Sequence, residues 1–121
     1  MRADMKSINK TYNIYVIELN PKVLNIKKFR DKNPDYIEGK PCVYVGYTEK
    51  TPEERFAEHK AGMRKGSLRW HNLYAKKFGI RLKTRLFKYQ NAQNMSQQEA
   101  MKMEIEKAKR LRKRGYAVWQ N

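Results

Sequence analysis

Residues 33–48, NPDYIEGKPCVYVGYT, contain two overlapping patterns that could act on a phosphodiester bond. The first is Asp35 with Glu38-x-Lys40, a carboxylate–carboxylate–lysine set of the kind that holds a divalent cation. The second is Tyr44-Val45-Gly46, at the end of an apolar run. Asp35 and Glu38 are too close in sequence to converge from separate strands, and they lie in a turn-rich loop. A solvated loop is the better interpretation of the first pattern, so attention moves to Tyr44.

One carboxylate falls on an apolar helix face. Residues 97–114 predict a helix that opens with a Ser96/Glu99 capping box and ends before Gly115. Glu104 projects from the middle of its predicted apolar stripe, which consists of Ala100, Met101, Ile105, Ala108 and Leu111. A carboxylate aimed at a core is costly unless it meets a cation or a metal. A buried salt bridge and a metal ligand are therefore the two interpretations.

A second predicted helix, beginning at Thr51-Pro52 and reaching Gly62, repeats this feature. Arg55 and His59 are four residues apart and share a face with Phe56 and Met63. Read alone, Arg55 could extend its charge to solvent and His59 could be a hydrogen-bonded core histidine. Because two helices both direct ionisable groups inward, a purely structural explanation accounts for them less easily.

The remaining predicted elements must position these groups. Strands are predicted at 12–20 and 41–48, and their inward faces hold Tyr15 and Tyr44, either of which could be an ordinary core residue. Gly46 would let another group approach the backbone closely. A helix over 67–79 and a half-buried strand over 80–89 complete the order, with YAVWQN as a short tail. The order favours an α+β fold with a small antiparallel sheet covered by helices.

Charge dominates the composition of this 121-residue chain, which is one domain by size. Lys and Arg number 28 against 12 acidic residues, a net charge of +16, so a polyanion is the expected partner. Nucleic acid fits best, because the basic residues are spread along the chain and mixed with aromatic ones. No segment has transmembrane character, and a soluble, cytoplasmic protein without membrane partners is expected. The single cysteine, Cys42, reads as a buried core residue.

Four motifs in order resemble the GIY-YIG nuclease family. Asn13-Ile14-Tyr15 stands at the first tripeptide, with Asn in place of glycine, and Tyr44-Val45-Gly46 is similar to the second. Arg55-x-x-x-His59 matches the following helix, and EAMKME (99–104) is similar to the segment that ends in the family glutamate, here Glu104. The resemblance covers about residues 12–116.

The resemblance implies a three-stranded antiparallel sheet flanked by helices, and metal-dependent endonuclease activity on nucleic acid, with DNA favoured and RNA an alternative. It implies that Glu104 holds a single Mg²⁺ or Mn²⁺ and that Tyr44 is the general base. Tyr15 would position water or phosphate, Arg55 would stabilise the charge that develops on the phosphoryl group, and His59 would assist Tyr44 or bind phosphate. A single carboxylate suits a hard cation that keeps most of its waters. The pathway would be repair, restriction or a mobile element.

The chain departs from the family pattern in three places. A basic, irregular inserted loop at about 21–40 separates the two tyrosines, and Asn13 replaces glycine. Tyr47 stands where some members have an activating lysine, which leaves Lys50 as the nearest candidate. Further nucleic-acid contacts are expected past the helix, where a solvated connection is the alternative: Arg64, Lys65, Arg69 and Trp70.

Charge does not separate a nuclease from a basic protein that only binds nucleic acid with the same fold. Specificity would come from the 21–40 loop, from DNA structure, from a partner protein or from a homodimer. A third reading, a basic structural domain, predicts no steep salt dependence of nucleic-acid binding.

Overall fold

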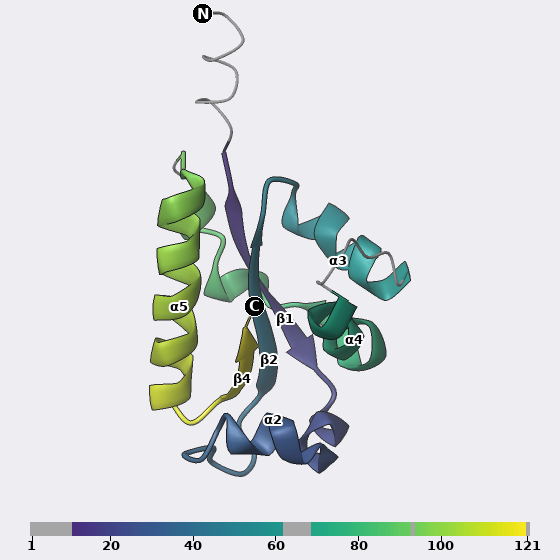
Figure 1. Ribbon diagram of the computed structural model, residues 1–121. Helices are drawn as coiled ribbons and strands as arrows, with labels where there is room; N and C mark the ends of the chain where they lie inside the picture. The colour runs from purple at the N-terminus through teal and green to yellow at the C-terminus, as the bar shows by residue number, and fades with distance from the viewer. Residues whose placement is uncertain (1–10, 62–68, 93, 121) are drawn as a thin grey trace, which may run out of the picture.

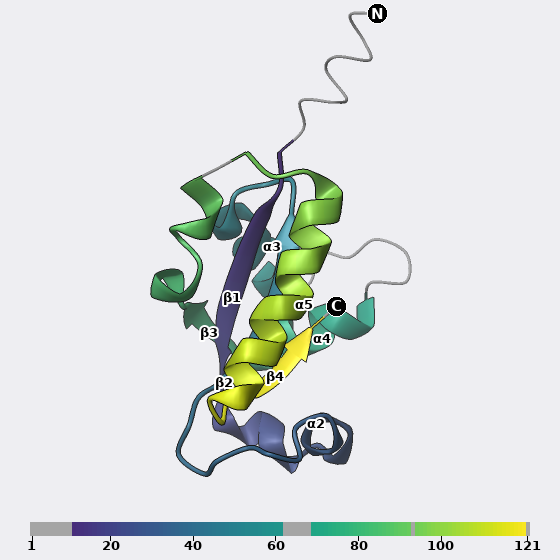
Figure 2. The same cartoon turned by 90° about the vertical axis from the view of Figure 1, so that its left-hand side faces the viewer.

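A four-stranded mixed sheet lies between helices on both of its faces (Figures 1 and 2). The computed structural model describes residues 11–61, 69–92 and 94–120. The strands are β1 (Asn13–Leu19), β2 (Cys42–Thr48), β3 (Gly79–Leu82) and β4 (Ala117–Gln120). Their order in the sheet is β3-β1-β2-β4, in which β1 pairs antiparallel with β2 and β3, and β4 lies parallel to β2. The predicted α+β class is confirmed, but the prediction of a sheet with three antiparallel strands was wrong.

The fourth strand comes from the YAVWQN segment, which the sequence assigned to a tail. Helix α5 (Gln97–Lys113) ends in a Schellman turn at Gly115, whose φ of +90° favours glycine. The Tyr116 amide donates to Leu111 O at 3.0 Å and the Gly115 amide donates to Arg112 O at 2.9 Å. This turn sends the chain back along β2, where Val118 and Trp119 become buried.

The sequence predicts the starts of both long helices correctly. At α3 (Pro52–Ala61), the Glu54 amide donates to Thr51 Oγ1 at 3.1 Å and the Thr51 amide donates to Glu54 Oε1 at 3.0 Å. At α5, Ser96 and Glu99 form the equivalent pair. These reciprocal bonds satisfy amides that lack partners within the first turn of a helix.

The buried face of α5 differs from the predicted stripe. Met101 and Ile105 are exposed by 45% and 44%, so their assignment to the core was wrong. The side chains that α5 buries are Ala100, Glu104, Lys107, Ala108 and Leu111. The helix is rotated so that small alanines meet the sheet closely, which carries Glu104 fully into the interior.

The 21–40 segment is helical in its first half, where its description as irregular was wrong, and consists of turns and bends over 32–40. It forms a 3₁₀ turn at Pro21–Asn25 and a short helix, α2 (Lys27–Asp31). Phe29 of α2 is fully buried and stacks on Trp119 of β4, with ring centroids 6.2 Å apart. Tyr74 of α4 (Arg69–Phe78) meets the same indole edge-on at 4.8 Å. This aromatic cluster attaches α2 and α4 to one face of the sheet.

The strand predicted over 80–89 ends at Leu82, and a 3₁₀ turn at Thr84–Leu86 follows. Pairing stops because the Asn91 side chain takes the next position along β1. Its amide nitrogen donates to Ile14 O at 2.7 Å, and its oxygen accepts from the Ile14 amide at 2.9 Å. A further 3₁₀ turn at Gln90–Ala92 presents Asn91 for this contact, and it covers an otherwise unpaired strand edge.

Candidate functional site

The two tyrosines lie side by side on one face of the sheet. Tyr15 is directly opposite Gly46 in the β1–β2 register, and Tyr44 precedes Gly46 by two residues, so both phenols project from the same face. Their ring centroids are 6.2 Å apart. A Cβ atom on Gly46 would lie 2.5 Å from the Tyr15 hydroxyl oxygen and 2.6 Å from its Cζ. The glycine therefore makes room for the Tyr15 phenol, which confirms the close approach expected there.

Helix α3 covers this face and brings His59 against both phenols. His59 Nε2 and the Tyr15 hydroxyl share a hydrogen bond of 3.0 Å, and the Tyr44 ring meets the imidazole edge-on at 5.3 Å. All three side chains are fully buried. His59 is therefore a hydrogen-bonded core histidine, as one of its two interpretations predicted. Its partner is Tyr15, one of the two motif tyrosines.

Arg55, one turn before His59, connects this cluster to the surface. Its side chain is 18% exposed and its Nη1 donates to Glu58 Oε1 at 3.1 Å. On its inner side the guanidinium lowers the pKa of Tyr15 by its positive charge and by hydrogen bonding. Four of the five predicted catalytic residues therefore come together from β1, β2 and α3: Tyr15, Tyr44, Arg55 and His59.

Burial controls the protonation of the phenols. Loss of solvent raises the pKa of Tyr15 to about 12, although Arg55 opposes the shift. Burial also raises the pKa of Tyr44 well above its ordinary value, the neighbouring Tyr15 raises it further, and Arg55 again lowers it. Both phenols therefore keep their protons at neutral pH. For Tyr44 to accept a proton, more positive charge must come close to it than the resting site provides.

Glu104 acts on the tyrosines through its charge, from a helix on the other face of the sheet. Helix α5 covers the sheet face opposite α3 and α4 (Figures 1 and 2), and Glu104 is 4% exposed on its inner surface. Its negative charge raises the pKa of both Tyr15 and Tyr44. The inward direction predicted for Glu104 is confirmed.

The donor chemistry fits a hard divalent ion only in part. A carboxylate oxygen suits Mg²⁺ or Mn²⁺, which take their other ligands from water and phosphate. Within the described part of the chain, no group of three or more His, Cys, Asp or Glu side chains could hold a metal ion. Glu104 is the single residue predicted as a ligand, and because it is 4% exposed, a hydrated ion must displace neighbouring side chains to reach its carboxylate.

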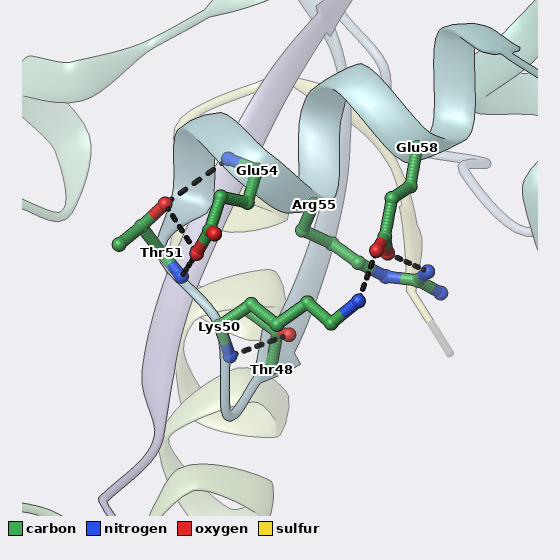
Figure 3. Close-up of polar contacts among 6 residues, drawn as sticks. All are labelled: Thr48, Lys50, Thr51, Glu54, Arg55 and Glu58. Atoms are coloured by element: carbon green, nitrogen blue, oxygen red, sulfur yellow. Dashed lines mark hydrogen bonds and ion pairs between the residues drawn. The ribbon is translucent and has the colours of Figure 1, made fainter.

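Lys50 takes a position at the surface of the site (Figure 3). Its ammonium pairs with the Glu58 carboxylate, which also receives Arg55. The Lys50 amide donates to Thr48 Oγ1 at 3.0 Å, and its carbonyl accepts from the Asn13 side chain at 2.9 Å. The Lys50 ammonium is thus paired with Glu58 rather than aimed at Tyr44. Asn13, at the glycine position of the motif, holds the turn that carries Lys50.

Two residues that the sequence did not assign to the site are Glu58 and Asn13. The sequence could have suggested Asn13, because the pairing of β1 with β2 places this first residue of β1 opposite Thr48, next to the turn that holds Lys50. Glu58 gave no signal, because a glutamate outside the apolar stripe of a helix usually faces water.

The other predicted contacts separate into groups. Arg64 and Lys65 lie outside the described residues, and Arg69 and Trp70 belong to α4, although their side chains lie outside the described part. Asp35 and Glu38 are exposed, as a solvated loop requires. Cys42 is buried, which raises the pKa of its thiol to about 11 and leaves it a core residue.

No protein-family model, curated protein or solved structure matches this chain. Within the described residues, every helix is too short or too polar to cross a bilayer.

Proposed function

We propose that this protein is a divalent-metal-dependent endonuclease that hydrolyses phosphodiester bonds of nucleic acid, with DNA as the favoured substrate. The observation that carries the proposal is the convergence of two tyrosines, an arginine and a histidine from three elements on one sheet face. These residues are the ones that resemble the GIY-YIG motifs, and Gly46 leaves the space that Tyr15 needs.

Each group has a task in this reaction. Tyr44 accepts the proton of the attacking water as a phenolate, so its own proton must first pass to solvent, and nearby positive charge that lowers its raised pKa favours this loss. Arg55 binds the phosphoryl oxygens and stabilises the charge that develops on them. Tyr15 orients the water or phosphate, and His59 fixes the Tyr15 hydroxyl by their hydrogen bond. Glu104 would hold one Mg²⁺ or Mn²⁺, which when bound polarises the phosphate and supplies positive charge.

Access is a constraint on this function. Tyr15, Tyr44 and His59 are fully buried, so a phosphodiester must displace side chains before it reaches them. Beside these buried residues, Arg55 and its ion-pair partner Glu58 extend to the surface, each with an 18% exposed side chain. Substrate therefore enters over Arg55.

A plasmid-nicking assay tests the proposal. The wild-type protein is expected to convert supercoiled DNA to nicked and linear forms with Mg²⁺ or Mn²⁺ and to leave it intact in EDTA. Glu104→Gln keeps the shape of the side chain, removes its charge and should abolish cleavage. If the wild type cuts neither DNA nor RNA with either metal, the nuclease proposal is lost.

The second candidate is a basic protein that binds nucleic acid without cutting it. The complete burial of both phenols and the +16 charge favour it, since docking on phosphates requires no access to the core. It predicts salt-sensitive binding that Glu104→Gln leaves unchanged, with no cleavage by either protein.

A further inference from the structure

A carboxylate bridges two cations at the entrance to the tyrosine cluster. Glu58 Oε1 accepts from Arg55 Nη1 at 3.1 Å, and Glu58 Oε2 pairs with the Lys50 ammonium. The three side chains come from α3 and from the turn before it, and Figure 3 shows the Glu58 carboxylate between the two cations. Two oxygens held by a guanidinium and an ammonium is also the arrangement by which proteins hold a phosphate.

The turn that carries Lys50 is held firmly in place. Thr48 and Asn13 bind the Lys50 backbone on both sides, and the Thr51–Glu54 capping box fixes the first turn of α3 directly after it. Lys50 itself is 48% exposed, so its ammonium can exchange Glu58 for another anion at the surface. A fixed backbone that carries an exposed ammonium group is suited to capturing a phosphate from solution.

Glu58 remains ionised while it holds this position. Hydrogen bonding from Lys50 and then from Arg55 keeps the pKa of its carboxyl below the usual range. At neutral pH the single negative charge of Glu58 is therefore shared between Lys50 and Arg55, and Arg55 is the cation that acts on the buried phenols. A phosphate oxygen pair that replaced it would lie against Arg55, whose guanidinium already acts on Tyr15.

We propose that Lys50 and Arg55 form a binding site for a backbone phosphate of nucleic acid, and that Glu58 occupies it in the free protein as an internal competitor. This inference rests on the proposed function for the nature of the ligand, but it concerns binding rather than cleavage. Displacement of Glu58 is the step that opens the path over Arg55.

The test is the affinity of a short labelled DNA duplex in EDTA, measured by fluorescence anisotropy. Glu58→Gln removes the competing charge and keeps the shape, so affinity should rise by about three- to tenfold, the range expected for loss of one or two partly exposed ion pairs. Glu53→Gln is the matched control, because Glu53 is exposed on the same helix and carries the same charge. Its effect, from net charge alone, should stay below about twofold.

Lys50→Gln gives a second, independent measurement. It should weaken binding, and in the Glu58→Gln background it should weaken binding more, because the ammonium is then released from its competitor. Thermal unfolding of each variant checks that it is folded. A gain for Glu58→Gln no larger than that for Glu53→Gln, or a loss of affinity, overturns the inference. EDTA keeps this affinity measurement independent of cleavage. A gain in affinity here, together with no cleavage in the plasmid assay with Mg²⁺ or Mn²⁺, would remove the proposed function and leave the phosphate site.

Discussion

At the scale of single residues, the site depends on one missing side chain. The sequence indicated that Gly46 would allow a close approach, and the structure identifies the group that approaches as the Tyr15 phenol. The sequence also singled out Arg55 and His59, because polar residues on apolar faces are costly without a partner, and it singled out Tyr44 by the resemblance of Tyr44-Val45-Gly46 to the second tripeptide. It could not identify Glu58, whose role follows from the turn at Lys50 and not from any periodicity.

Gly46→Ala should destabilise the fold and disturb the site. The new methyl group would overlap the Tyr15 hydroxyl and Cζ, and the buried ring has no free direction to move. The free energy of unfolding should fall by about 1–3 kcal/mol, as for other overpacked cores. Urea denaturation measures this loss, and Tyr15→Phe shows how much comes from the bond to His59 alone. An unchanged unfolding free energy in Gly46→Ala would mean that the phenol is not held against Gly46.

The buried phenols should also make the protein sensitive to alkali. The folded protein keeps the Tyr15 proton up to a pKa of about 12, whereas the unfolded chain releases it near pH 10. The folded state thus binds more protons between these values, and stability falls as the pH rises through them. Tyr15 alone contributes about 2–3 kcal/mol, which is present below pH 10 and lost by pH 12.

Denaturation at pH values on either side of this window measures the effect. The decrease in unfolding free energy should be smaller in Tyr15→Phe than in the wild type, because the variant lacks this proton. Equal decreases in the two proteins would show that Tyr15 titrates with an ordinary pKa.

At the scale of elements, local signals were sufficient for α3, α4, α5 and the two central strands, and insufficient for α2 and β4. Both capping boxes and the glycine at the end of α5 predicted helix ends, because each depends on residues close in sequence. Strand β4 was missed because its four residues depend on β2, far away in the chain, and on the aromatic cluster around Trp119. The rotation of α5 was missed because Ala100 and Ala108 pack more closely than Met101 and Ile105 could.

One side chain attaches the 21–40 segment to β4. The Asn33 oxygen accepts from the Val118 amide at 2.7 Å and from Arg112 Nε at 3.1 Å. Its nitrogen donates to Phe29 O at 2.9 Å and to Val118 O at 3.1 Å. Asn33 is 5% exposed, so these bonds have no water to replace them.

Asn33→Ala should therefore cost about 2–4 kcal/mol of unfolding free energy, because buried backbone groups of β4 and α2 lose their partners. Hydrogen exchange should become faster at Phe29 and Val118 before it does elsewhere. Asn94→Ala is the matched control: Asn94 is exposed, and its loss should stay within about 0.5 kcal/mol. Similar losses for the two variants would contradict the role given to Asn33.

At the scale of the whole molecule, the proposed binding and the proposed cleavage have different origins. The +16 charge comes from basic residues along the whole chain, so affinity for a polyanion is shared among many of them. The proposed cleavage would depend on one cluster that is closed to solvent in the free protein. A change at one buried hydroxyl should therefore separate the two properties.

The most direct test is the single-turnover cleavage rate of Tyr44→Phe with Mg²⁺ or Mn²⁺, alongside its DNA affinity in EDTA. Tyr89→Phe is the matched control, because it removes the same hydroxyl group from a tyrosine that is 77% exposed and lies outside the site. Tyr44→Phe should cut about 10²–10⁴-fold more slowly than the wild type, the contribution of a general base, with its affinity unchanged. Tyr89→Phe should match the wild type in rate. Cleavage by Tyr44→Phe at the wild-type rate would contradict the assignment of the active site to this tyrosine cluster.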